Sequence, residues 1–120
     1  FYIFILYFMK ITTKEFEDLF EKYPLYSQEK SKDPLVITKL FVANITWYLT
    51  EYDKNSKDAF WFVQGLQNDE FGYIHLPELE EIKIKGLFEV ERDLYFTQAP
   101  ITTFLIGETK KKVKEMLWNK

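Results

Sequence analysis

The chain has 120 residues, of which 47% are hydrophobic and 19% aromatic, so it can bury one sizeable core. Its formal net charge of −3 argues against generic nucleic-acid binding, for which a basic surface supplies most of the affinity. The absence of cysteine excludes disulfides, thiolate zinc sites and cysteine nucleophiles, and the single histidine, His75, excludes a site that needs two imidazoles from one chain. We therefore expect a single cytoplasmic domain over residues 9–120.

An uninterrupted apolar octapeptide, residues 1–8, precedes Met9 and Lys10. Eight residues are too few to cross a bilayer as a helix. The segment also lacks the basic region, the longer apolar region and the small-residue cleavage site of a secretory signal. We expect no membrane segment here and interpret the octapeptide as an N-terminal extension, either an artefact of the reading frame or an added strand.

The first part of the domain predicts a helix, a loop and a strand. Thr12 as the N-cap and Glu15 three residues later match a capping box, and apolar residues then recur at helical spacing until Pro24. A polar loop follows over residues 25–34. The apolar run over residues 35–43 then predicts a strand.

The centre of the chain, residues 45–66, predicts a β-hairpin. Two runs rich in aromatic and β-branched residues flank a short polar segment that has no large apolar residue. Alternation places Trp47 and Trp61 on one face of the hairpin, and Tyr48 and Tyr52 on the other. Since both strands are apolar on both faces, each face needs cover: a helix on one, and a further helix, a neighbouring chain or a ligand on the other.

The rest of the chain predicts short elements separated by turns. The pattern indicates strands over 71–75 and 87–96, a short helix over 76–82, an ambiguous apolar stretch over 101–106 and an amphipathic helix over 108–118. Strands and helices do not alternate regularly enough for a doubly wound sheet. The expected fold class is α+β, with an antiparallel sheet of four or five strands packed by N-terminal and C-terminal helices.

Five separated motifs together resemble a known group of small bacterial proteins. They are Tyr-Pro-Leu-Tyr-Ser-Gln at 23–28, Lys-Leu-Phe at 39–41, Trp-Tyr-Leu-Thr-Glu-Tyr-Asp at 47–53, Gly-Tyr-Ile leading into Leu-Pro-Glu-Leu-Glu at 72–80, and Glu-Arg-Asp-Leu-Tyr-Phe at 91–96. In order and spacing they are similar to domain-of-unknown-function family 2958. The resemblance implies an accessory protein of a plasmid, conjugative element or phage, and it supplies no catalytic residues.

Tyrosines form the most suggestive set of candidate binding residues. Tyrosine brings apolar area and a hydroxyl to an interface at low entropic cost. If Tyr48 and Tyr52 share a strand face, they make a surface able to dock a protein; Tyr26, Tyr73 and Tyr95 are further candidates. The alternative, which stays open, is a tyrosine-rich, half-buried sheet.

Arg92, the only arginine, supports a second hypothesis. A lone guanidinium on an apolar strand face either pairs with a buried carboxylate such as Glu51 or binds the anion of a ligand. In the second case Arg92, Tyr48 and Tyr95 would form a pocket for a small anionic molecule such as a nucleotide.

Three acidic residues at alternate positions, Glu89, Glu91 and Asp93, support a third hypothesis. Carboxylates on one strand face can hold Mg²⁺, which would suit a metal-dependent hydrolase. Acidic residues at alternate positions also occur on solvated strand edges, and we favour that interpretation.

The leading hypothesis is a non-enzymatic accessory module of a mobile element or phage that binds another protein, with counter-defence as one such role. We expect no cofactor and no resident metal, and the chain contains no residue pattern that fixes a catalytic site. The partner protein could also be a second copy of this chain, so a homo-oligomer stays open as an alternative.

Overall fold

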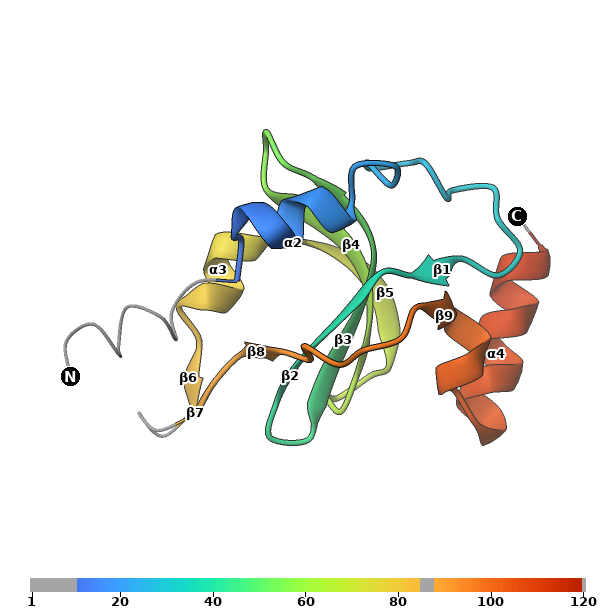
Figure 1. Cartoon of the computed structure of the whole chain (residues 1–120). Coiled ribbons are helices and arrows are strands. Elements are labelled where there is room, and N and C mark those ends of the chain that lie inside the picture. The colour runs from blue at the N-terminus through green and yellow to red at the C-terminus, as the bar shows by residue number, and fades with distance from the viewer. Residues whose placement is uncertain (1–10, 85–87, 120) are drawn as a thin grey trace, which may run out of the picture.

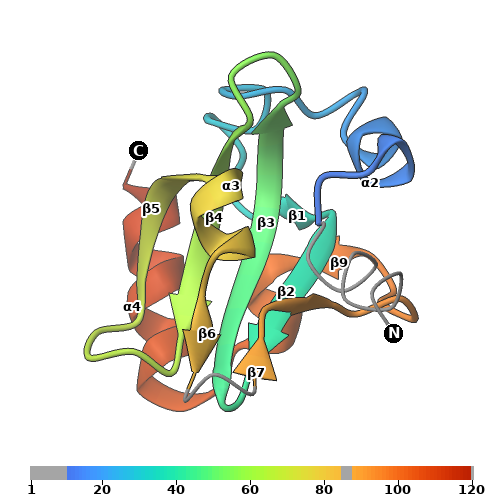
Figure 2. The same cartoon turned by 90° about the vertical axis from the view of Figure 1, so that its left-hand side faces the viewer.

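The computed structural model describes residues 11–84 and 88–119, so the apolar octapeptide lies outside the described residues. In the described part a five-stranded antiparallel sheet has the strand order β5-β4-β3-β2-β8, and two pairs of short strands, β1 with β9 and β6 with β7, flank it (Figures 1 and 2). This confirms the predicted α+β class. The strands are β1 Leu35–Val36, β2 Thr38–Val42, β3 Ile45–Asp53, β4 Asp58–Gln64, β5 Glu70–His75, β6 Lys83–Ile84, β7 Phe88–Glu89, β8 Glu91–Arg92 and β9 Ala99–Pro100. The helices are α2 Lys14–Leu19, α3 Leu76–Glu80, the 3₁₀ helix η1 Ile101–Phe104 and α4 Gly107–Trp118.

Helices cover both faces of the sheet (Figure 1). On what we call the first face, α2 and α3 pack on a core that includes Trp47, Leu49 and Val63. On the second face, η1 and α4 pack on a separate core that includes Tyr48 and Phe62. Both faces of the central hairpin are therefore covered, as the apolar character of its strands predicted.

The predicted hairpin is confirmed as β3 and β4, and a glycine is required just beyond it. Gly65 has φ +99°, a conformation that side chains strain. A Cβ atom at Gly65 would also lie 2.3 Å from the backbone oxygen of Asn44, in the neighbouring β2–β3 turn. This close approach fixes how the β2–β3 turn packs against the end of β4.

The first helix begins one residue later than predicted and is shorter. Thr13, not Thr12, is its N-cap and accepts a hydrogen bond from the Phe16 amide at 3.2 Å. Thr12 cannot serve as the cap because its amide and hydroxyl donate to the Glu80 carboxylate of α3. The regular helix ends at Leu19, before Pro24.

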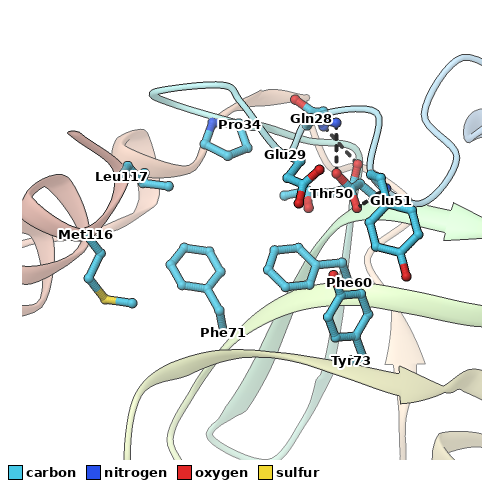
Figure 3. Close-up of a pocket in the computed structure, with 11 residues that line it drawn as sticks. Gln28, Glu29, Pro34, Thr50, Glu51, Phe60, Phe71, Tyr73, Met116 and Leu117 are labelled. Atoms are coloured by element: carbon cyan, nitrogen blue, oxygen red, sulfur yellow. Dashed lines mark hydrogen bonds between the residues drawn. The ribbon is translucent and has the colours of Figure 1, made fainter. Parts of the chain in front are cut away.

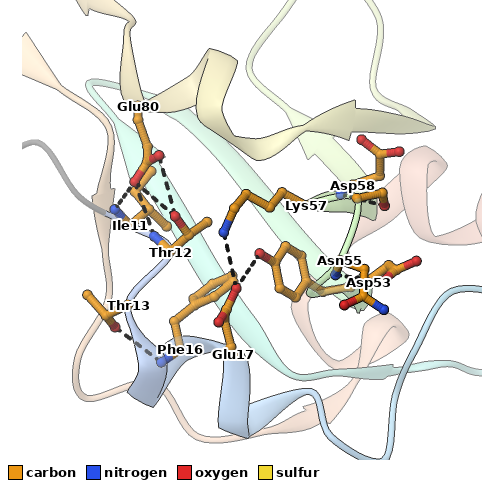
Figure 4. A network of polar contacts seen from close by, with 12 residues as sticks. Ile11, Thr12, Thr13, Phe16, Glu17, Asp53, Asn55, Lys57, Asp58 and Glu80 are labelled. Carbon is orange, nitrogen blue, oxygen red and sulfur yellow. Dashed lines mark hydrogen bonds and ion pairs between the residues drawn. The ribbon is translucent and has the colours of Figure 1, made fainter.

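A polar network holds α2 against the first face (Figure 4). The Glu17 carboxylate accepts hydrogen bonds from the Tyr52 hydroxyl at 3.0 Å and from the Lys57 ammonium at 3.4 Å. At the other end, Glu80 accepts the Thr12 amide at 3.1 Å. Each of these side chains has its partner within the fold, so the network has a structural role.

The strand predicted over 87–96 is wrong. The chain changes sheet at Val90, which is buried in the core of the first face. Before Val90, β7 pairs with β6; after Val90, β8 pairs with β2. Glu89 and Glu91 therefore belong to strands of different sheets.

The C-terminal part follows the prediction more closely. The ambiguous stretch over 101–106 contains η1, and the amphipathic helix is confirmed as α4, with Val113 and Leu117 buried and Met116 exposed. No helix of the described residues is both long enough and apolar enough to cross a membrane.

Candidate functional site

A β-bulge in the longest strand creates the candidate site. Leu49 of β3 is opposite Trp61 and Glu51 is opposite Phe60, so Thr50 is an extra residue without a partner in β4. Leu49 and Tyr52 both belong to the core of the first face. The two residues between them, Thr50 and Glu51, consequently both turn toward the second face.

Glu51 is only 3% exposed, and its carboxylate binds the loop over residues 24–34 to the sheet. One of its oxygens accepts the Tyr26 amide and the other accepts the Gln28 amide, each at 2.8 Å. Hydrogen bonds from backbone N–H groups to a carboxylate are among the stronger ones and offset the cost of burying the charge.

Gln28 ties the same loop to two strands. Its side-chain amide donates to the backbone oxygens of Leu35 and Thr50, both at 2.8 Å, and its side-chain oxygen accepts the Leu35 amide at 2.7 Å. The far end of the loop is held by Asp33, which accepts the Thr102 hydroxyl at 2.6 Å. The loop is therefore anchored at both ends and forms a fixed wall.

Tyr26, within this loop, has a left-handed backbone with φ +73°. A bulky residue with positive φ is uncommon and costs about 1–3 kcal/mol, so the surrounding structure must hold it in place. The hydrogen bond from its amide to Glu51 does so. With this backbone the ring of Tyr26, a residue that is 62% exposed, lies beside Tyr73 of β5, with 6.4 Å between ring centroids.

Aromatic rings from β4 and β5 form the floor of the site. Phe60 stacks on Phe71 with ring centroids 5.6 Å apart and 3° between the planes, and it contacts Tyr73 at 4.8 Å. Phe71 in turn packs edge-on against Phe62, which is buried in the core of the second face. The floor is thus continuous with the second core.

These elements enclose a cavity of about 280 Å³, called here the aromatic cavity (Figure 3). Figure 3 shows Gln28, Glu29, Thr50 and Glu51 gathered at one end, and Phe71, Met116 and Leu117 at the other. The lining residues are Tyr26, Gln28, Glu29, Pro34, Thr50, Glu51, Phe60, Phe71, Tyr73, Met116 and Leu117. The cavity therefore has an acidic end and an apolar end.

Thr50 has an uncompensated polar atom at this site. The side chain is 1% exposed, and its hydroxyl has no hydrogen-bond partner among the described residues. A buried hydroxyl without a partner costs about 1–3 kcal/mol. Native structures rarely contain such a group without a reason, and a ligand is one such reason.

Two carboxylates at the acidic end act on the neighbouring Tyr73 hydroxyl. Burial raises the pKa of the Tyr73 hydroxyl above its ordinary value. The neighbouring Tyr26 and the carboxylates of Glu51 and Glu29 raise it further. A negative charge that forms at this end is disfavoured, and a positive charge is favoured.

The predicted tyrosines are divided between different places. Tyr26 lines the aromatic cavity, whereas Tyr48 and Tyr52 are buried, at 8% and 2% exposure, in the cores of opposite faces. The prediction that Tyr48 and Tyr52 share a face is wrong, because the bulge at Thr50 reverses the alternation of β3. They cannot form a common docking surface.

Arg92 pairs with Glu15 of α2 rather than with Glu51. Arg92 and Tyr95 do line one open groove, of about 400 Å³, together with Lys39 and Phe41. Tyr48 packs under Phe104 in the second core instead, so the three residues predicted for an anion pocket do not come together.

The three carboxylates predicted as weak metal candidates are also separated. Glu89 and Glu91 lie in strands of different sheets, and Asp93 accepts the Tyr95 amide in a turn. Within residues 11–84 and 88–119, no three His, Asp or Glu side chains gather where they could hold a metal ion.

The sequence did not identify Thr50, Glu51, Phe60 or Phe71 as residues of one site. The sequence did indicate that both faces of the hairpin are apolar, so that the face turned away from the first helix layer needed a cover or a ligand. The bulge that turns Thr50 and Glu51 to the same side is not visible in the pattern.

Comparison with known proteins identifies a family for the chain. The family described as protein of unknown function (DUF2958) matches residues 10–113, which is most of the chain and includes every residue that lines the aromatic cavity except Met116 and Leu117. No curated protein and no solved structure matches the chain.

Proposed function

Because the chain belongs to DUF2958, a family of proteins of unknown function, we propose its role from the site: it is a non-enzymatic module that binds another protein. The observation that carries the proposal is the rim of the aromatic cavity. Tyr26, Tyr73 and Met116 line the cavity, yet they are 62%, 55% and 57% exposed. Tyrosine and methionine are enriched at the buried centres of protein interfaces.

The rim differs from a chance scatter of exposed apolar residues. Single exposed apolar side chains are normal on any protein, but a group around a concave, aromatic site indicates an interaction surface. The cavity walls are fixed by the bonds of Glu51 and Gln28, so little ordering would be needed on binding. A partner protein that covers the rim would bury all three side chains at once.

We extend the proposal to an accessory role in a plasmid, conjugative element or phage, with counter-defence as one form of it, and to a cytoplasmic setting. The five motifs that resemble the family support the first part, and the cysteine-free composition is compatible with the second. A second copy of this chain is one form that the partner could take.

Pull-down from host extract with two double variants tests the proposal. Tyr26→Ser with Tyr73→Ser removes two exposed rings from the rim, and Leu94→Ser with Tyr95→Ser removes two exposed apolar side chains elsewhere as a matched control. All four residues are more than half exposed, so both variants should fold. Capture of a specific protein by the wild type and the control, with loss in the rim variant, is expected. Loss in the control variant alone would contradict the proposal.

A further inference from the structure

Among the described residues that line the aromatic cavity, the charged side chains are all acidic. Glu29 and Glu51 contribute carboxylates, and the described lining residues include no lysine, arginine or histidine. The Glu51 oxygens accept one backbone amide each, and a carboxylate has about four acceptor positions. The acidic end can therefore accept further hydrogen bonds from a donor-rich group.

The Thr50 hydroxyl adds a polar atom to the same end. It is buried without a partner among the described residues, and it can accept as well as donate a hydrogen bond. Ammonium and guanidinium groups only donate, so they match a site that offers carboxylate and hydroxyl acceptors.

The aromatic wall favours the same class of ligand. The ring faces of phenylalanine and tyrosine attract cations within about 6 Å of the ring centre, and groups of such rings bind ammonium ions. In Figure 3, Phe60 and Tyr73 lie beside Thr50 and Glu51, and Phe60 is the neighbour of Glu51 in the adjacent strand. A cation between these rings and the Glu51 carboxylate would be attracted both by the ring faces and by the negative charge.

Size and shape restrict the ligand further. At about 280 Å³ the cavity falls just below the range of about 300–1,000 Å³ that is typical of sites for drug-sized molecules, so it suits one amino-acid side chain better than a nucleotide. The apolar end, with Phe71 and Met116, matches the methylene stem of lysine or arginine.

We infer that the aromatic cavity binds a lysine or arginine side chain of the partner protein, with its cationic group at Glu51 and its stem on Phe60 and Phe71. The inference rests on the proposed function and gives the chemistry of its ligand. The exposed rim favours a side chain carried by a protein over a free amine, because only a protein would also cover Tyr26 and Tyr73.

Titration of the full chain with small probes, followed by ¹H–¹⁵N NMR, tests the inference. The probes are n-butylammonium and n-butylguanidinium, with neutral n-butanol and anionic butyrate as controls at matched ionic strength. The Tyr26 and Gln28 amides report directly, because both donate to Glu51. We expect at least one cation to shift both amides saturably, in the millimolar range of small fragments. Equal effects of n-butanol, or a preference for butyrate, would overturn the inference.

Two variants separate cation binding from simple apolar binding. Phe60→Leu keeps apolar volume but removes a ring, and should weaken n-butylammonium about threefold while leaving n-butanol unchanged. Phe104→Leu, on the same sheet face but outside the cavity lining, is the matched control and should change neither probe. Equal weakening of both probes in Phe60→Leu would contradict a cation site.

One further probe tests the source of the cation. Nα-acetyl-lysine N-methylamide presents the side chain from a peptide backbone and should bind at least as tightly as n-butylammonium, since it also reaches the rim. Tighter binding of the free amine would overturn the assignment to a protein side chain. If no cation binds but the rim variant still loses its partner in pull-down, the proposed function stands and this inference fails.

Discussion

The two faces of the sheet are both apolar, but they are covered in different ways. On the first face, α2 and α3 close over a core in which Trp47 and Leu49 are buried, and the polar groups of Glu17 and Glu80 are paired. On the second face, α4 and the loop over residues 24–34 leave the aromatic cavity open. The core of the first face contains more buried residues than the core of the second, although a polar groove of about 420 Å³, lined in part by Glu17, Phe20 and Tyr52, lies beside it.

Four departures from ordinary protein geometry meet at the aromatic cavity, although others lie elsewhere: Trp61 Nε1 on the first face also has no partner among the described residues, and Ala43 and Lys57 also have positive φ. The bulge at Thr50, its unpartnered hydroxyl, the buried carboxylate of Glu51 and the left-handed backbone of Tyr26 all lie at one cavity. Each has a cost, and such costs tend to persist where they serve a function. The meeting of four such features at one cavity supports our proposal that the second face binds a partner.

The largest expected loss of stability comes from a substitution in the core of the first face. Trp47→Ala should lower the free energy of unfolding by about 3–5 kcal/mol, because Trp47 is almost fully buried. Phe60→Ala, at a half-buried ring beside the cavity, should lower it by only about 1–2 kcal/mol. Urea unfolding measures both values. Equal losses would show that the two faces contribute alike to stability.

Two backbone positions with positive φ sharpen the comparison. Gly65→Ala should destabilise by about 1–3 kcal/mol from strain, before the contact with the Asn44 oxygen is counted. Tyr26→Gly should change stability little, because relief of strain offsets the greater flexibility of glycine in the unfolded chain. Thermal unfolding tests both. A large loss in Tyr26→Gly would mean that the ring itself stabilises the fold.

A tyrosine of the first face should control stability at high pH. Burial, and then the hydrogen bond to Glu17, raise the pKa of Tyr52 well above its ordinary value. The folded state thus holds the proton more tightly than the unfolded state, and stability should fall as pH rises above about 10. Tyr52→Phe removes the hydrogen bond to Glu17 and should lower the free energy of unfolding by about 1.5 kcal/mol at neutral pH. Above about pH 10 the stability of this variant should fall less steeply than that of the wild type.

The matched control for this prediction is on the second face. Burial alone raises the pKa of Tyr48, without the contributions that Glu17 and other carboxylates make at Tyr52, so Tyr48→Phe should change the alkaline slope less than Tyr52→Phe. Urea unfolding at several pH values between 8 and about 11 measures the slopes. An unchanged slope in Tyr52→Phe would contradict the assignment.

The sequence predicted elements that depend on local pattern. The hairpin, α4 and the fold class follow from alternation, helical spacing and turn residues, and the structure confirms them. The break at Val90 was not predictable, because each half of that segment favours strand and only tertiary packing decides which sheet it joins.

The candidate site was only partly predictable for a related reason. Tyr26 was identified from its chemistry, but simple alternation put Tyr52 on the wrong face and could not bring Thr50 and Glu51 together. A bulge shifts the faces of every later residue in its strand, and nothing in the side-chain pattern of β3 marks its position.

The smallest expected effect tests the central claim, that the second face keeps an unpaired polar group at a binding site. Thr50→Val removes the unpartnered hydroxyl and should raise the free energy of unfolding by about 1 kcal/mol. Thr102→Val, the matched control, removes a hydroxyl that donates to Asp33 at 2.6 Å and should lower it. Urea unfolding of the wild type and both variants measures the two changes in the free energy of unfolding. Stabilisation by Thr50→Val alone supports the account, and an equal loss in both variants would contradict it.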